Sequence, residues 1–234
     1  LSINDGGIEP LLIEVGTNKK LPTFQSGLVL YLPFDEGQGT TAYDLSGYHH
    51  DAYLLDSSTT NPGGPTWSNG WLRNGIYCDG IGDYVRIYNT SVIQELVKKI
   101  TISVFAKPEP NSVYNHIVDR SGQSYWYIRV QNSYVFSPNG GQGEASYQPP
   151  NLWSVWANIS ATYDGNISKI YYNGDLKNKT AWSGNLGGNN GDVILCNAGF
   201  LGSLHIYKGF IDELRIYNRA LSDAEIKALY EATK

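Results

Sequence analysis

The chain has 234 residues, of which 41% are hydrophobic and 17% charged, and its formal net charge is −5. This charge argues against a nucleic-acid partner, because phosphate backbones need a concentrated lysine and arginine surface. The sequence has no apolar run of about 18 residues, so we expect no membrane insertion. Its 18 tyrosines, 6 tryptophans and 26 glycines favour β-strands joined by tight turns.

Residues 1–26 mix glycine, proline, lysine and asparagine without sustained alternation, which predicts a linker or an added edge strand. Residues 27–234 are predicted to form one large β domain, a size that sandwiches often reach. Apolar and aromatic runs separated by turn residues predict its strands, at 28–34, 75–78, 84–88, 100–106, 125–130, 153–163, 169–172, 193–196 and 210–217.

Three patterns support this organisation. The pairs Asp164-Gly165 and Asn173-Gly174 are typical of type I′ hairpin turns and predict a β-meander. Residues 100–104 alternate apolar with polar side chains, which predicts one face in the core and one in solvent. Ser222 and Glu225 have the spacing of a capping box, so one short C-terminal helix is expected, with Ile226 and Leu229 facing inward.

Several segments between about residues 27 and 231 together resemble the laminin-G-like jelly-roll domains of the concanavalin A-like lectin/glucanase superfamily. They are GLVLYLPFDE at 27–36, DLSGY at 44–48, DGIGDYVRI at 79–87, WANISATYDG at 156–165, IYYNGDL at 170–176 and GFIDELRIYNRALS at 209–222. The resemblance implies an all-β fold with two stacked antiparallel sheets, a jelly-roll β-sandwich. It also implies adhesion or glycan binding as the usual role, often as one module of a longer protein.

The resemblance further implies a structural Ca²⁺ site. Asp44 and Asp212 match positions that bind calcium in many family members, and carbonyls from Gly47 to His50 would complete the oxygen ligands. The sequence Tyr-His-His at 48–50 departs from the small residues usual in that loop. The alternatives are an Asx-turn for Asp44 and a β-bulge or a hydrogen-bonded carboxylate for Asp212.

A glycan site would need aromatic rings on exposed loops, where sugar C–H groups can stack. The candidates are Trp67, Trp71, Tyr125, Trp126 and Trp182. The alternative is that these rings pack beneath their own loops, because large exposed aromatic groups favour unwanted association.

The two cysteines, Cys78 and Cys196, lie in apolar runs and are expected as buried thiols, with a bridge as the alternative. His49 and His50 are adjacent on an extended segment and would point apart, so no zinc site is expected there. His116 and His205 stand alone and are interpreted as ordinary packed or surface residues.

Catalysis is not expected. Asp212 and Glu213 are adjacent, which would place them on opposite sides of a strand, and no G-x-S-x-G elbow occurs. The function expected is a non-catalytic carbohydrate-binding or adhesion module, extracellular or on a cell or virion surface, where four N-x-S/T sequons would fit. Its partner would be a glycan or a cell-surface polysaccharide. The alternatives are a structural or protein-interaction domain and, less favoured, a glycoside hydrolase or polysaccharide lyase.

Overall fold

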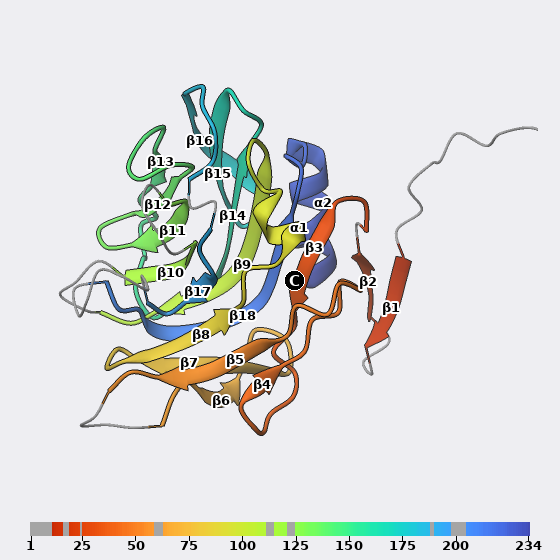
Figure 1. Cartoon of the computed structure of the whole chain (residues 1–234), viewed down its shortest axis with the longest axis vertical. Helices are drawn as coiled ribbons and strands as arrows, with labels where there is room; N and C mark the ends of the chain where they lie inside the picture. The colour runs from red at the N-terminus through yellow and green to blue at the C-terminus, as the bar shows by residue number, and fades with distance from the viewer. Residues whose placement is uncertain are drawn as a thin grey trace, which may run out of the picture.

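The computed structural model describes residues 11–15, 19–23, 25–58, 63–110, 115–120, 125–187, 190–197 and 205–234. Nearly all regular structure in these ranges is antiparallel β-sheet, arranged as two stacked layers (Figure 1). The predicted jelly-roll sandwich is therefore confirmed.

The first layer, sheet I, has eight strands among the described residues. In spatial order they are β13 (Ala145–Tyr147), β12 (Tyr134–Ser137), β11 (Tyr127–Val130), β10 (Asn115–Arg120), β17 (Val193–Leu195), β8 (Asp83–Ile87), β5 (Ala52–Asp56) and β4 (Thr41–Ala42).

The second layer, sheet II, runs in the order β16 (Asp175–Ala181), β15 (Ile167–Tyr172), β14 (Ala157–Tyr163), β9 (Ile100–Pro108), β18 (Lys208–Tyr217), β7 (Asn74–Asp79) and β6 (Thr66–Asn69). Strand β3 (Leu28–Leu32) pairs with β18 outside this path. The helices are α1 (Ser91–Gln94) and α2 (Asp223–Thr233), and neither is long and apolar enough to cross a membrane.

Strands β1 (Leu11–Val15) and β2 (Lys19–Thr23) pair with each other as a separate antiparallel ladder. Within the described residues this ladder joins neither sheet. The domain boundary predicted at residue 27 stays a prediction.

The inner faces of the two sheets share one apolar core. Strands of both layers contribute fully buried side chains to it, among them Leu30, Val85, Ile102, Ile128 and Ile216. Alternate side chains point to opposite faces of a strand, so each strand delivers every second residue to this layer. The polar residues between them therefore lie on the outer faces.

The outer face of sheet II is not open to solvent where the alternation of residues 100–104 predicted it to be. Thr101 and Ser103 are buried, because chain segments cover this face. Thr101 donates a hydrogen bond to the carbonyl of Arg219, and Phe105 on the same strand stacks against Trp71 and Tyr230. Local alternation shows which residues share a face, but not whether that face is covered.

Helix α2 is one of the elements that cover this face. Its predicted capping box is present, with Ser222 and Glu225 each bonding the other's backbone amide. Ile226 and Leu229 are buried as predicted, in a second apolar cluster with Leu28 and Tyr217. The terminal helix and its orientation are therefore confirmed.

The two predicted hairpins form, but only one has the expected turn. Asn173 and Gly174 both have positive φ, as a type I′ turn requires. At the other hairpin only Gly165 has positive φ, because the Asp164 carboxylate accepts hydrogen bonds from the amides of Asn166 and Ile167 and holds a longer turn.

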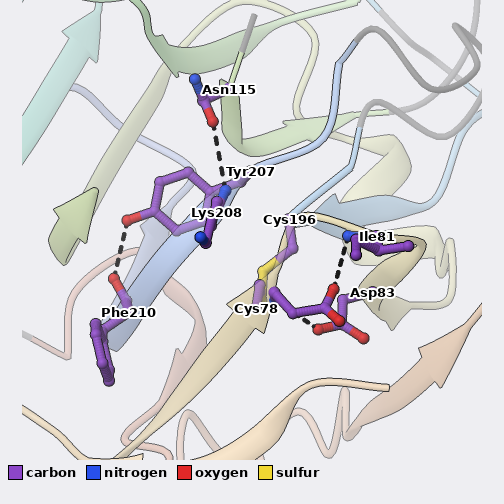
Figure 2. The surroundings of a disulfide bond; sticks show 9 residues. Cys78, Ile81, Asp83, Asn115, Cys196, Tyr207, Lys208 and Phe210 are labelled. Carbon is purple, nitrogen blue, oxygen red and sulfur yellow. Dashed lines mark hydrogen bonds between the residues drawn. A yellow bond between two sulfur atoms is a disulfide. The ribbon is translucent and has the colours of Figure 1, made fainter. Parts of the chain in front are cut away.

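A disulfide joins the two sheets. Cys78 in β7 bonds to Cys196, which directly follows β17, so the bridge crosses the sandwich from sheet II to sheet I (Figure 2). The expectation of buried free thiols is wrong. The cysteines are 118 residues apart in sequence, and their Cα atoms lie 6.3 Å apart only because the layers stack.

We expect the double variant Cys78→Ser/Cys196→Ser to lose about 2–5 kcal/mol of unfolding free energy, because the bridge restricts the unfolded chain. Urea unfolding without reductant measures this. Adding reductant to unfolded wild-type protein before refolding should give the same loss, and the variant should not respond to reductant. Equal stability of variant and wild type would contradict a stabilising bridge.

Asp83 lies close to the bridge (Figure 2) and is buried. One oxygen of its carboxylate accepts a hydrogen bond from the amide of Asp79, at 2.8 Å. The pKa of Asp83 is raised to about 6, mainly by burial. The charges of Asp79 and Asp56 contribute to this rise, and the hydrogen bond from the Asp79 amide opposes it. The folded chain therefore holds this proton more tightly than the unfolded chain.

The sign of the pH effect follows from this raised pKa. Between about pH 4 and pH 6 the folded state binds more protons at Asp83, so the free energy of unfolding should fall as pH rises through this window. Asp83→Asn should flatten that slope and raise stability at pH 7.5 by about 1–2 kcal/mol. Denaturant unfolding at several pH values measures it, with the exposed Glu95→Gln as the control. An unchanged slope in Asp83→Asn would contradict the expectation.

Candidate functional site

The Asp44 carboxylate organises the loop in which calcium was predicted. One oxygen accepts hydrogen bonds from the amides of Tyr31 and Ser46, both at 2.9 Å. The other accepts from the Ser46 hydroxyl at 2.7 Å and the His50 amide at 2.9 Å. A carboxylate offers about four lone-pair sites, so the protein's own donors occupy all of them.

His50 is equally engaged. Its Nδ1 lies 3.0 Å from the carbonyl of Val29, which can only accept, so Nδ1 carries the proton. Its Nε2 then accepts from the hydroxyl of Thr90, 2.8 Å away, and Thr90 is the N-cap of α1. Gly47 has φ +94, and this left-handed backbone forms the turn between Ser46 and His50.

Asp212 lies in a different environment. Its carboxylate is buried and accepts hydrogen bonds from the amides of Leu72 and Glu213, at 2.9 and 2.8 Å. Burial and then the charge of Glu213 raise the pKa of Asp212 well above its ordinary value. The ladder between β18 and β9 shifts register just after Asp212, which is the β-bulge considered as an alternative. Gly70 is needed here, because a Cβ would lie 2.6 Å from Asp212 Oδ2.

These residues do not fit a calcium ion as they are arranged. The carboxylates of Asp44 and Asp212 share no hydrogen-bond partner, and backbone or hydroxyl donors already saturate Asp44. No group of three or more His, Cys, Asp or Glu side chains in the described ranges could hold a metal ion. Calcium at Asp44, Gly47, His50 and Asp212 stays a prediction of the family resemblance alone.

The predicted glycan-stacking tryptophans serve packing. Trp126 is fully buried in the core, which corrects its prediction as an exposed platform. Trp71 stacks on Phe105 at 4.9 Å and donates to the carbonyl of Thr233, so it secures the end of α2. Trp182 packs against Tyr163, with ring centroids 5.3 Å apart.

Two of the predicted aromatic residues lie nearer to open surface. Trp67 packs partly on the core and donates from Nε1 to the carbonyl of Gly39, at 2.8 Å. Tyr125 is half-buried beside Tyr127, with ring centroids 5.5 Å apart. Of the five predicted stacking residues, only Tyr125 lies against the outer face of sheet I.

Strands β4, β5 and β8 lie together at one end of sheet I (Figure 1). A different set of aromatic side chains lies on this end of the sheet. Tyr43, Tyr53 and Tyr88 are 55%, 39% and 51% exposed, although tyrosine usually buries much of its ring. Alternation places all three on the outer face, since Ala42, Ala52 and Ile87 beside them are buried in the core. We call Tyr43, Tyr53 and Tyr88 the tyrosine face.

Polar groups surround this face. Arg86 stands opposite Tyr53 in the ladder between β8 and β5, and its guanidinium lies 4.6 Å from the Tyr88 ring centroid. Its Nε donates to Asp192 Oδ2 at 2.7 Å, so the cation is fixed against the ring. Rings held beside a fixed ion pair give a surface that combines stacking with directed hydrogen bonds.

A hollow adjoins Tyr43. It is lined by Glu36, Gln38, Gly39, Thr40, Thr41 and Tyr43. Thr41 pairs with Tyr53 in the sheet, so the hollow opens beside the tyrosine face. Trp67 supports one wall through its bond to Gly39. The arrangement can hold a polar ligand that has one flat apolar side.

The alternation that identifies this face is visible in the sequence. Val85 and Ile87 point inward, so Tyr84, Arg86 and Tyr88 point outward, and Tyr53 does the same between Ala52 and Leu54. The prediction of stacking rings on loops left these tyrosines out, because they lie on strands and at strand ends.

We expect Asp44→Ala to lower the free energy of unfolding by about 2–4 kcal/mol, because four donors lose their acceptor. Asp44→Asn, which keeps one acceptor oxygen, should lose less. Thermal unfolding of the wild type should be the same with EDTA and with added calcium. A wild-type melting temperature that falls in EDTA, and no longer does so in Asp44→Ala, would instead establish calcium at this loop.

Comparisons with solved structures agree with this fold. Domain 4 of AbnA, an extracellular arabinanase from Geobacillus stearothermophilus in complex with arabinotriose, has a TM-score of 0.68 and 18% identity, covering 88% of this chain and 98% of that one. The binding domain of Paraclostridial Mosquitocidal Protein 1 has a TM-score of 0.67 and 16% identity, covering 88% of this chain and 52% of that one. The botulinum neurotoxin serotype G binding domain has a TM-score of 0.66 and 15% identity, covering 87% of this chain and 50% of that one.

The chain thus spans about half the length of the two toxin domains, and at these identities the likeness is one of fold. No curated protein matches the chain by sequence. Residues 79–227, more than half of the chain, match the family described as the concanavalin A-like lectin/glucanases superfamily. The chain therefore belongs to the concanavalin A-like lectin/glucanase superfamily.

Proposed function

We propose that this chain is a non-catalytic carbohydrate-binding module of a secreted or surface protein, and that it binds glycan on the tyrosine face. The observation that carries the proposal is the exposure of Tyr43, Tyr53 and Tyr88 on one side of one sheet. The rings of Tyr53 and Tyr88 contact each other, with centroids 5.7 Å apart. Exposed aromatic groups that gather in this way often mark the binding site of a ligand or a partner.

The chemistry of the face suits sugars. The C–H faces of a pyranose or furanose ring can stack on tyrosine rings, while its hydroxyl groups need donors and acceptors at the edge. Arg86 and Asp192 supply one fixed donor and acceptor pair, and Glu36 and Gln38 in the adjoining hollow supply others. The Arg86 charge is balanced by Asp192, which favours neutral glycans over strongly charged ones.

The comparison with the arabinanase domain supports the same ligand class, because that domain was solved with arabinotriose. Its fold likeness to this chain covers nearly its whole length. Arabino-oligosaccharides are therefore a rational first probe.

The disulfide supports a secreted or surface location, because such bonds persist in oxidising compartments. The sequons are compatible with that location to different degrees. Asn166 and Asn178 are exposed, whereas Asn158 is buried and inaccessible in the folded chain. We therefore expect glycan attachment at Asn166 and Asn178 rather than at Asn158.

The carboxylates of Asp212 and Glu213, which were considered for catalysis, have structural partners, and this supports a non-catalytic role. Glu213 forms a buried ion pair with Arg215 at 2.6 Å, and Tyr31 donates to the same carboxylate. Asp212 accepts two backbone hydrogen bonds, and Asp35 faces Arg73 at 3.5 Å. These partners give each of these carboxylates a structural role.

A protein partner on the same face is the second candidate function. Tyrosine and arginine are enriched at protein interfaces. One similar structure, the binding domain of botulinum neurotoxin DC, was solved in complex with rat synaptotagmin II, with a TM-score of 0.61 and 18% identity. The two candidates differ in which ligand, a glycan or a protein, loses affinity when the tyrosines are replaced.

We expect Tyr53→Ala and Tyr88→Ala each to remove about 1–2 kcal/mol of glycan binding, a roughly 5- to 30-fold loss of affinity, because each removes a stacking ring. Titration calorimetry with arabinotriose and a panel of neutral oligosaccharides measures this. Tyr48→Ala is the matched control, since Tyr48 is 48% exposed on a loop outside the face.

Two results would overturn the glycan proposal. One is the absence of binding across the panel by the folded wild-type chain. The other is binding that Tyr48→Ala and Tyr53→Ala weaken equally. If the tyrosine variants instead abolish capture of a defined extracellular protein, the second candidate function replaces the first.

A further inference from the structure

A second cluster of chemical groups lies on the outer face of sheet I, centred on β10. Ile117 and Val118 both point into the core, because the ladder with β11 shifts register between His116 and Val118. This β-bulge breaks the usual alternation, so that His116 and Asp119 both lie outside the core. The two side chains face each other, with His116 Nδ1 and Asp119 Oδ2 3.3 Å apart.

The other nitrogen of His116 meets a second imidazole. His116 Nε2 lies 3.2 Å from His205 Nδ1, and the two rings meet edge to face with centroids 5.0 Å apart. His205 is distant in sequence and precedes β18, so only the fold brings it here. The rings of Tyr125 and Tyr127 also pack against His116.

Three features of this cluster are those of a metal site. Two imidazole nitrogens bound to one tetrahedral zinc, each at about 2.0–2.1 Å, lie roughly 3.3 Å apart, close to the separation seen here. The far nitrogen of a metal-bound histidine usually faces a carboxylate, which is where Asp119 lies. Asp119 is nine-tenths buried or more, and neither of its oxygens has a hydrogen-bond partner among the described residues.

We propose that His116 and His205 bind a divalent transition-metal ion such as Zn²⁺, with Asp119 orienting His116 from behind. The ion takes the place of the proton that the two facing nitrogens otherwise share. The described residues provide two direct ligands and no third His, Cys, Asp or Glu, so water or an exogenous group fills the remaining positions.

Arg129 opposes the site and gives a variant that should strengthen it. Arg129 lies on β11 opposite His116, and its charge acts on both histidines. It is held near Glu144, at 3.5 Å. Removing the positive charge should raise affinity for a cation, which a merely structural role of the histidines does not predict.

The test is calorimetric titration of the folded full chain with ZnCl₂ at pH 7.5, with Co²⁺ absorption as the report on coordination. We expect one Zn²⁺ per chain, and at least tenfold weaker binding by His205→Ala. Asp119→Asn should weaken binding about 10- to 100-fold, as the loss of an orienting carboxylate does. Arg129→Gln should bind more tightly, and His49→Ala, on a separate loop, should equal the wild type.

The proposal is overturned if the wild type binds no zinc at millimolar concentration, or if His205→Ala binds as tightly as the wild type. It is also overturned if His49→Ala removes the bound ion, which would assign binding to the loop at residues 49–50. Circular dichroism of each variant shows whether a loss of binding reflects unfolding, and tighter binding by Arg129→Gln supports the site without depending on a loss.

Discussion

Burial of one apolar layer between two sheets is the constraint on which the rest of this structure depends. Because strand side chains alternate, a residue that must face inward fixes its neighbours on the outer face. The inward positions are filled almost completely by Val, Ile, Leu, Ala and aromatic residues. Chemical variety is therefore confined to outer faces, loops and bulges. The disulfide between Cys78 and Cys196 ties the two layers together across this same core.

Among the register shifts in the described strands, two lie at unusual polar groups. In β18 the register shifts between Asp212 and Arg215, and Glu213 has φ +55, a left-handed conformation rare outside glycine. The result is a buried ion pair between Glu213 and Arg215 on the side that carries Tyr31. In β10 the shift after His116 places that residue beside Asp119. The bulge in β18 produces a buried ion pair, Glu213 with Arg215. The bulge in β10 brings His116 beside Asp119, and His116 also contacts His205.

The family resemblance was sufficient for the fold class, and local alternation and capping were sufficient for the predicted strands and the C-terminal helix. The strand prediction missed β4, β5, β6, β10, β12 and β13. The sequence could not show that Thr101 and Ser103 would be covered, since the covering segments come from elsewhere in the chain. It also could not pair Cys78 with Cys196 or His116 with His205, because those contacts depend on how distant strands stack. At the site, most of the predicted loop tryptophans are packing residues. The exposed tyrosines of the tyrosine face could have been predicted, because the alternation of the strands is visible in the local sequence.

The tyrosine face and the histidine pair occupy the same face of sheet I, and register shows how they are separated. Arg86 stands opposite Ile194 in β17, and Ile194 stands opposite Asp119 in β10. A single strand therefore separates the polar edge of the tyrosine face from the carboxylate behind His116. Ile194 is apolar and buried, so it carries no hydrogen bond from one site to the other. Hydrogen bonds do connect the two neighbourhoods by another path, because Asp192 accepts from Arg86 and from the amide of Asn89, and the side chain of Asn89 accepts from Arg120, the chain neighbour of Asp119. Coupling between a glycan and a metal ion would therefore pass through these polar groups rather than through Ile194.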